Sequence, residues 1–146
     1  MKRIITLVLA VLLLSALCAC ASGAKITFKN EHLTTVHSIY ITVTDAMDWG
    51  EPVNGYVVEK DKSTTIRFSK FSSEEAENDH TEAVEYDVAV LENSDILYTF
   101  YTVPLRDGDT LAFSGVGLFG TLKVTGADGS TETYKGEGEK VETTTR

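Results

Sequence analysis

The chain has 146 residues, with 22 Asp and Glu against 13 Lys and Arg, and a formal net charge of −9 at pH 7. This acidic balance argues against a nucleic-acid-binding face and against electrostatic attachment to anionic lipid, because both require clustered basic side chains. The length is enough for one domain with a sizeable core and too short for two.

The start of the chain predicts an export signal. Lys2 and Arg3 precede an apolar run over residues 4–14, and small residues follow from Ser15. A basic start, an apolar run of this length and small residues near a cleavage site are the three parts of a secretory signal peptide. A membrane-spanning helix needs about 20 apolar residues, and this run is shorter. We therefore expect residues 1–19 to be a cleaved signal.

The sequence Leu17-Cys18-Ala19-Cys20 resembles the lipobox of bacterial lipoproteins. In that family a Leu three places before the Cys, and a small residue just before it, direct diacylglycerol onto the Cys. The resemblance implies that Cys20 is lipidated, with Leu17 as the recognition residue and Ala19 at the cut. Cys18 stands where the family usually has Ser or Ala. The resemblance also implies an exported protein anchored in a bacterial membrane, the outer membrane if the host is Gram-negative.

A second cleavage site stays open, because Ala19-Cys20-Ala21 has the A-x-A form of ordinary secretion. Both cysteines of the chain lie in this region, so a mature protein that begins at Cys20 has no possible disulfide. Loss of the two basic residues of the signal changes the formal net charge to −11. Attachment to the membrane must then come from acyl chains, two or more of which give stable anchoring. Residues 20–24 would be the lipidated tether.

Residues 38–50 predict a strand that runs into a loop. Three aliphatic residues alternate with Tyr and Thr: Ile39, Ile41 and Val43 on one face, and Tyr40, Thr42 and Thr44 on the other. This period of two is expected of a strand with one buried face. The loop holds Asp45, Asp48 and the only tryptophan, Trp49. We interpret Trp49 as a lid over the end of the core, with contact to a partner as the alternative.

The rest of the chain repeats this pattern of short strands and turns. Further strands are expected over residues 25–29, 56–59, 64–69, 85–91, 96–105, 110–114, 121–125 and 131–135. Residues 71–83, rich in acidic side chains, are interpreted as an exposed loop, and residues 136–146 as a disordered tail. The pattern predicts an all-β chain: a single antiparallel β-sandwich of about eight or nine short strands over residues 25–135.

A second resemblance covers residues 25–113. The motifs that carry it are, in order, Phe28-x-Asn30, Ile39-Tyr40-Ile41, Trp49-Gly50, Ile66-x-Phe68, Tyr86-Asp87-Val88, Tyr98-x-Phe100, Val103-x-Leu105 and Gly108-Asp109. Their order resembles that of small exported β-sandwich domains of bacteria without an assigned activity. The resemblance implies the same fold and supplies no function.

Residues 115–120, GVGLFG, match the G-x-G-x-x-G dinucleotide fingerprint. That fingerprint needs a strand before it and a helix after it, whereas residues 121–125 predict a strand. We therefore interpret the glycines as a bend between strands, not as a cofactor site. Val116, Leu118 and Phe119 cannot all pack beneath so short a bend. At least one of them should be exposed, and the three are candidates for an apolar tip that contacts a partner.

Four aspartates, Asp45, Asp48, Asp107 and Asp109, lie just past or between predicted strands. They could bind calcium if their loops meet at one end of the scaffold, because calcium prefers oxygen ligands. EF-hand spacing is missing and Asp is a common turn residue, so solvated turns are the favoured interpretation. We expect no other cofactor.

The sequence offers no catalytic motif. His32, His37 and His80 form no H-E-x-x-H motif, and no Ser lies in a G-x-S-x-G turn. The interpretation is a non-enzymatic binding or structural module of the bacterial cell envelope, with an envelope protein or a glycan as its partner. Two alternatives stay open. One is a calcium-dependent binding module, and the other is an exported hydrolase with two carboxyls about 5 to 9 Å apart in a cleft.

Overall fold

The computed structural model describes residues 23–44, 46, 48–69, 83–93 and 95–141. These residues form the strands β1 (Gly23–Asn30), β2 (Val36–Val43), β3 (Ser63–Ser69), β4 (Val84–Glu92), β5 (Ile96–Leu105), β6 (Thr110–Val116), β7 (Phe119–Thr125) and β8 (Thr131–Lys140). No helix that is long and apolar enough to cross a membrane occurs among them. The prediction of an all-β domain is confirmed. The predicted signal, Cys20 and nearly all of the predicted acidic loop lie outside the described residues.

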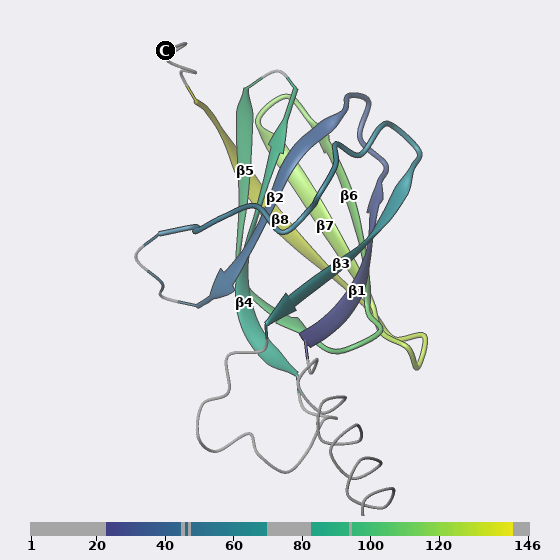
Figure 1. The fold of residues 1–146 in the computed structure, drawn as a ribbon. Helices are drawn as coiled ribbons and strands as arrows, with labels where there is room; N and C mark the ends of the chain where they lie inside the picture. Colours follow the sequence, from purple (N-terminus) through teal and green to yellow (C-terminus); the bar gives the residue numbers. More distant parts are fainter. Residues whose placement is uncertain (1–22, 45, 47, 70–82, 94, 142–146) are drawn as a thin grey trace, which may run out of the picture.

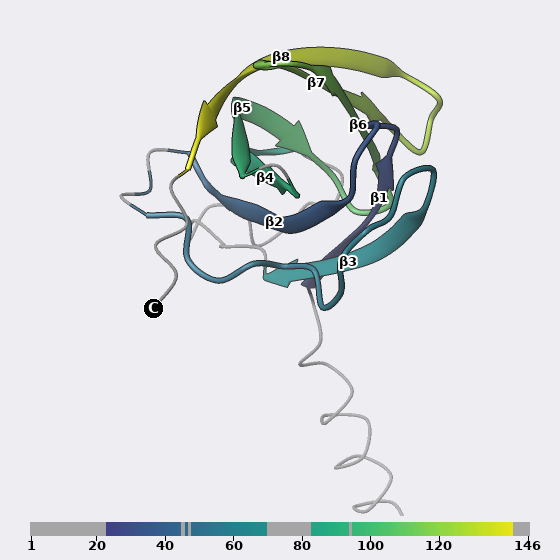
Figure 2. The same ribbon diagram turned by 90° about the horizontal axis from the view of Figure 1, so that it is seen from above.

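One mixed sheet contains all of these strands, in the order β2-β4-β5-β8-β7-β6-β1-β3. It curls almost into a barrel (Figures 1 and 2). Neighbouring strands are antiparallel except β1 and β6, which are parallel, so the predicted all-antiparallel arrangement is wrong at this pair. The predicted sandwich is not confirmed. Inward and outward residues alternate in both architectures, so the sequence pattern could not distinguish them.

The interior of the curled sheet is filled with side chains. The largest fully buried ones are Tyr86, Tyr98, Phe28, Phe100, Phe113, Ile26, Ile39, Ile66, Leu105, Leu111, Leu122 and Val36. Phe113 lies at the centre of an aromatic group, with its ring centroid 5.2 Å from Tyr98 and 6.2 Å from Phe100. Aromatic pairs at such separations contribute about 0.5–1.5 kcal/mol beyond the area they bury. The buried inward residues of the predicted strands therefore form one core.

Strand β8 extends to Lys140, so the prediction of a disordered tail from residue 136 is wrong for the first part of that segment. The strand pairs with both β5 and β7. Two of its inward positions, Gly136 and Gly138, are glycines because rings of β5 occupy the space above them. A Cβ added at Gly136 would lie 2.7 Å from Phe100 Cε1, and one at Gly138 would lie 2.9 Å from Tyr98 Cε1. The segment lacks apolar side chains because the neighbouring strand supplies them.

The predicted strand over residues 56–59 is reduced to one isolated bridge. Val58 and Val36 exchange backbone hydrogen bonds of 2.8 and 2.9 Å, while Tyr56 and Val57 are exposed. The other predicted strands correspond to β1–β8, with ends that differ by up to five residues.

The connections between consecutive strands lie at two opposite ends of the domain (Figure 1). We call the end where β1 starts the entry end, and the opposite one the far end. The far end contains the turns at residues 31–35, 59–62 and 117–118, together with the ends of β4 and β8 and the start of β5. Backbone hydrogen bonds join these segments, including Asn93 N to Thr35 O at 2.9 Å and Val141 N to Asp95 O at 2.7 Å.

Candidate functional site

Seven of the exposed apolar side chains in the described part of the chain lie on segments at the far end. They are Leu33 (71% exposed), Tyr56 (85%), Val57 (50%), Val116 (78%), Leu118 (47%), Phe119 (76%) and Val141 (41%). We call these seven residues the far-end apolar group. Tyr101, in β5, is exposed away from this end. Exposed apolar side chains that gather in one region of a soluble domain mark a contact surface more often than single scattered ones do.

The tip at residues 115–120 is a tight hairpin between β6 and β7. Val116 pairs with Phe119, so Gly117 and Leu118 form a two-residue turn. Gly117 has a φ of 61°, which the first central residue of a type II′ hairpin turn requires. Because strands lie on both sides, the interpretation as a bend is confirmed. The expected exposure of the tip is also confirmed, whereas its contact with a partner stays a prediction.

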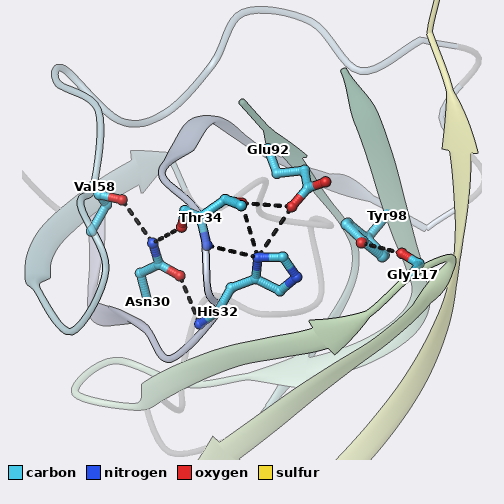
Figure 3. Close-up of polar contacts among 7 residues, drawn as sticks. All are labelled: Asn30, His32, Thr34, Val58, Glu92, Tyr98 and Gly117. Carbon is cyan, nitrogen blue, oxygen red and sulfur yellow. Dashed lines mark hydrogen bonds and ion pairs between the residues drawn. The ribbon is translucent and has the colours of Figure 1, made fainter. Parts of the chain in front are cut away.

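A buried polar cluster lies beneath the far end (Figure 3). Asn30, at the end of β1, is fully buried and holds the following turn together. Its Nδ2 donates to the carbonyl oxygens of Thr34 and Val58, at 2.9 and 2.8 Å, and its Oδ1 accepts from His32 N at 2.9 Å. One side chain therefore satisfies two backbone groups of the turn and joins the turn to Val58, whose carbonyl oxygen also accepts from Val36 N.

His32 and Glu92 form the second half of this cluster. Both side chains are over nine-tenths buried, and His32 Nδ1 lies 3.1 Å from Glu92 Oε2. The Thr34 hydroxyl lies between them, 3.0 Å from Nδ1 and 2.6 Å from Oε2. A hydroxyl can accept one hydrogen bond while it donates another, so a proton on Nδ1 satisfies all three groups. The Thr34 backbone N–H also lies 3.3 Å from Nδ1, and it can donate to this nitrogen only when Nδ1 carries no proton.

The cluster links the turn at residues 31–35 to β4 and to the core. The His32 ring stacks on Phe113, with 5.2 Å between centroids and 23° between planes. An imidazole and a carboxylate become catalytic when a nucleophile lies within hydrogen-bond reach of the second ring nitrogen. Among the described residues no hydrogen bond joins His32 Nε2 to a side chain. The contacts instead tie the turn at residues 31–35 to β4 and to the core.

The alternative of a calcium site, which the sequence left open beside solvated turns, is not assembled by the described residues. Asp48 is exposed, and its Oδ1 accepts from Gly50 N at 3.0 Å, which is a turn contact. Asp45 lies outside the described residues. Within the described ranges, no group of three or more His, Cys, Asp or Glu side chains is placed to hold a metal ion.

Asp107 and Asp109 lie at the entry end, between β5 and β6. Asp107 Oδ1 accepts from Lys25 N, and Asp109 Oδ2 accepts from Arg106 N, both at 2.7 Å. Burial raises the pKa of Asp109 above its ordinary value, although the hydrogen bond from Arg106 N opposes this. Asp109 and Glu132 both line a depression of about 370 Å³. Asp109 is only 3% exposed and bound to the backbone, so it is poorly placed to meet a substrate there.

Trp49 does not close the core. It is half-buried, and it is not among the described apolar side chains that pack against the core. Val43 and Val53, from β2 and from the segment after the tryptophan, pack there instead. The lid interpretation is therefore not supported, and a partner contact by Trp49 stays a prediction.

The comparisons with known proteins show no family. No protein family matches this chain, and no curated protein matches it. A protein from Eubacterium rectale, solved by NMR, is similar in structure with a TM-score of 0.44 and 12% sequence identity. The match covers 76% of this chain and 85% of that one. A likeness this distant carries no argument about function.

Proposed function

We propose that this chain is a membrane-anchored bacterial lipoprotein that serves as a non-enzymatic binding module of the cell envelope. The observation that carries the binding role is the far-end apolar group, which exposes large side chains at the end opposite to the start of β1. The lipobox-like sequence at Cys20 supports the anchor. A tether at the entry end would direct the far end away from the membrane and toward a second envelope component.

The partner that this surface fits is an envelope protein with an apolar patch of its own. Phe119 and Tyr56 are aromatic, and aromatic residues are enriched at the centres of protein interfaces. The buried cluster fixes the turn that carries Leu33, so this part of the surface is held in place before it binds. Such preorganisation reduces the entropy cost of association.

Anchoring should depend on Cys20. We expect Cys20→Ser to move the protein out of the membrane fraction or to leave it unprocessed, because serine cannot receive the thioether-linked lipid. Cys18→Ser is the matched control and should fractionate as the wild type does. Cell fractionation followed by immunoblotting measures both. A Cys20→Ser variant that is processed and retained like the wild type would show that the lipobox interpretation is wrong.

Phe119→Ser should leave stability nearly unchanged and weaken partner binding. The side chain is 76% exposed, so its removal is expected to change the free energy of unfolding by no more than about 0.5 kcal/mol. Capture from envelope extract, with the chain lacking residues 1–21 as bait, measures binding. Tyr101→Ser, which removes an exposed ring outside the far end, should retain the captured partner. A loss of several kcal/mol in Phe119→Ser would instead place the ring in the core.

A further inference from the structure

The segment at residues 53–58 covers the first half of the β2 edge. Ile39 O accepts from Val53 N at 2.7 Å, and backbone hydrogen bonds join Val58 to Val36 at the start of the strand. β2 is an end strand of the sheet, so its outward backbone groups have no neighbouring strand to pair with. The segment therefore closes an edge that would otherwise be open.

The side chain of Asn54 fastens this segment to β2. Its Oδ1 accepts from Ile39 N at 2.6 Å, and its Nδ2 donates to His37 O at 3.0 Å and to Tyr56 O at 2.9 Å. The amide oxygen thus faces a donor, and the amide nitrogen faces two acceptors. A carboxylate has no N–H group to donate, so conversion of this amide into a carboxylate would lose both contacts of Nδ2.

Asn54 is also the one asparagine of the chain that precedes a glycine. In an Asn-Gly pair the next backbone nitrogen attacks the side-chain amide most readily, because glycine has no Cβ to obstruct the approach. The nitrogen of Gly55 has no backbone hydrogen-bond partner in the described part of the chain. The backbone therefore does not hold this nitrogen away from the amide.

The two Asp-Gly pairs of the chain, which undergo the same ring closure more slowly, differ from this site in their glycine nitrogens. Gly108 N donates to Lys25 O at 2.7 Å, and Gly129 N donates to Gly126 O at 2.9 Å. Each of these nitrogens must give up a hydrogen bond before it can attack a side chain. Gly55 N carries no such restraint from the described backbone.

We propose that Asn54 is a site of spontaneous deamidation, and that this modification opens the β2 edge permanently. The Gly55 nitrogen loses its proton to hydroxide and attacks Asn54 Cγ. The Cγ–Nδ2 bond breaks, and Nδ2 leaves as ammonia after it gains a proton from water. Water then cleaves one of the two C–N bonds of the succinimide ring, which gives aspartate or isoaspartate. Overall, asparagine and water become an aspartate and ammonia, with no oxidant or reductant.

The hydrogen bonds of Asn54 determine when this reaction takes place. They hold the amide while the segment is closed, so the reaction proceeds from a locally opened form. Such opening needs little free energy where the chain is exposed, as Gly55, Tyr56 and Val57 are. After the reaction a carboxylate faces the carbonyl oxygens of His37 and Tyr56 and repels them. Because Tyr56 belongs to the far-end apolar group, the modification also loosens part of that surface.

Mass spectrometry of the full chain, incubated in detergent at mildly alkaline pH, tests the reaction. We expect a gain of about 1 Da that increases with time, and fragmentation should assign it to Asn54. Gly55→Ala is the matched control, because an added Cβ meets nothing within 4 Å yet lies beside the attacking nitrogen. It should slow the reaction by about tenfold or more. Reaction at Asn54 in the urea-unfolded chain but not in the folded one would overturn the proposal, as would equal rates in the wild type and Gly55→Ala.

Amide hydrogen exchange tests the structural consequence. Asn54→Asp reproduces the aspartate product, and the N–H groups of Val53 and Ile39 should then exchange about tenfold faster than in the wild type. Gly55→Ala keeps all three contacts of Asn54 and should exchange as the wild type does. Unchanged protection in Asn54→Asp would show that a carboxylate closes the edge as well as the amide does, which contradicts the proposed opening.

Discussion

Gly136→Val is expected to lower the free energy of unfolding by about 3 kcal/mol, the upper part of the usual range for overpacking a core. A Cβ at this position would meet the carbonyl oxygen of Thr99 and would lie 2.7 Å from Phe100 Cε1. The oxygen belongs to a paired backbone and cannot move aside without breaking the ladder between β5 and β8. Valine has a higher β-propensity than glycine, so local preference alone predicts the opposite sign. Denaturant unfolding measures the difference.

Gly55→Val is the matched control for this substitution. Gly55 is exposed, and a Cβ there would meet nothing within 4 Å. We expect a change within about 0.5 kcal/mol, as for most surface substitutions. Equal stability of the two variants would show that β8 does not pack closely against the rings of β5.

These glycines also show which parts of the fold could not be predicted from the sequence. The alternation of Ile39 and Ile41 with polar residues predicted β2, because a strand with one buried face has a local period of two. Gly136 and Gly138 gave no such signal, since the apolar atoms that cover them belong to β5. The same holds for the parallel pairing of β1 and β6, because strands far apart in the chain leave no local pattern when they pair.

The candidate site was likewise predictable from the sequence only in part. The exposure of Val116 and Phe119 was predictable, because so short a bend cannot cover large side chains. That Leu33 and Val141 lie at the same end of the domain as this tip depends on the directions in which β1 and β8 run. The contact between Thr34 and Glu92 joins residues 58 positions apart. A Glu at the end of an apolar strand predicts an exposed turn residue, so its burial could not be inferred from its neighbours.

Glu92→Ala is the second substitution with a large expected effect. It should lower the free energy of unfolding by about 2 to 3 kcal/mol, because it removes the buried acceptor of the Thr34 hydroxyl and the carboxylate beside His32 Nδ1, and one unsatisfied buried group costs about 1–3 kcal/mol. Glu92→Gln is the matched control. Its amide oxygen can still accept from the Thr34 hydroxyl at a similar position, so it should retain part of this free energy. Thermal and denaturant unfolding at one pH measure both.

A double-mutant cycle with His32→Phe separates the hydrogen-bonded pair from general packing. Phenylalanine keeps a ring against Phe113, which lies 5.2 Å from the imidazole centroid, but it has no nitrogen to satisfy. We expect the double variant His32→Phe/Glu92→Ala to be more stable than the sum of the two single effects predicts, because the second substitution removes a group that the first left unpaired. Residues in direct contact show such coupling at about 0.5–3 kcal/mol. Strict additivity would mean that Glu92 stabilises the far end through Thr34 alone, and that the 3.1 Å approach of His32 Nδ1 contributes nothing.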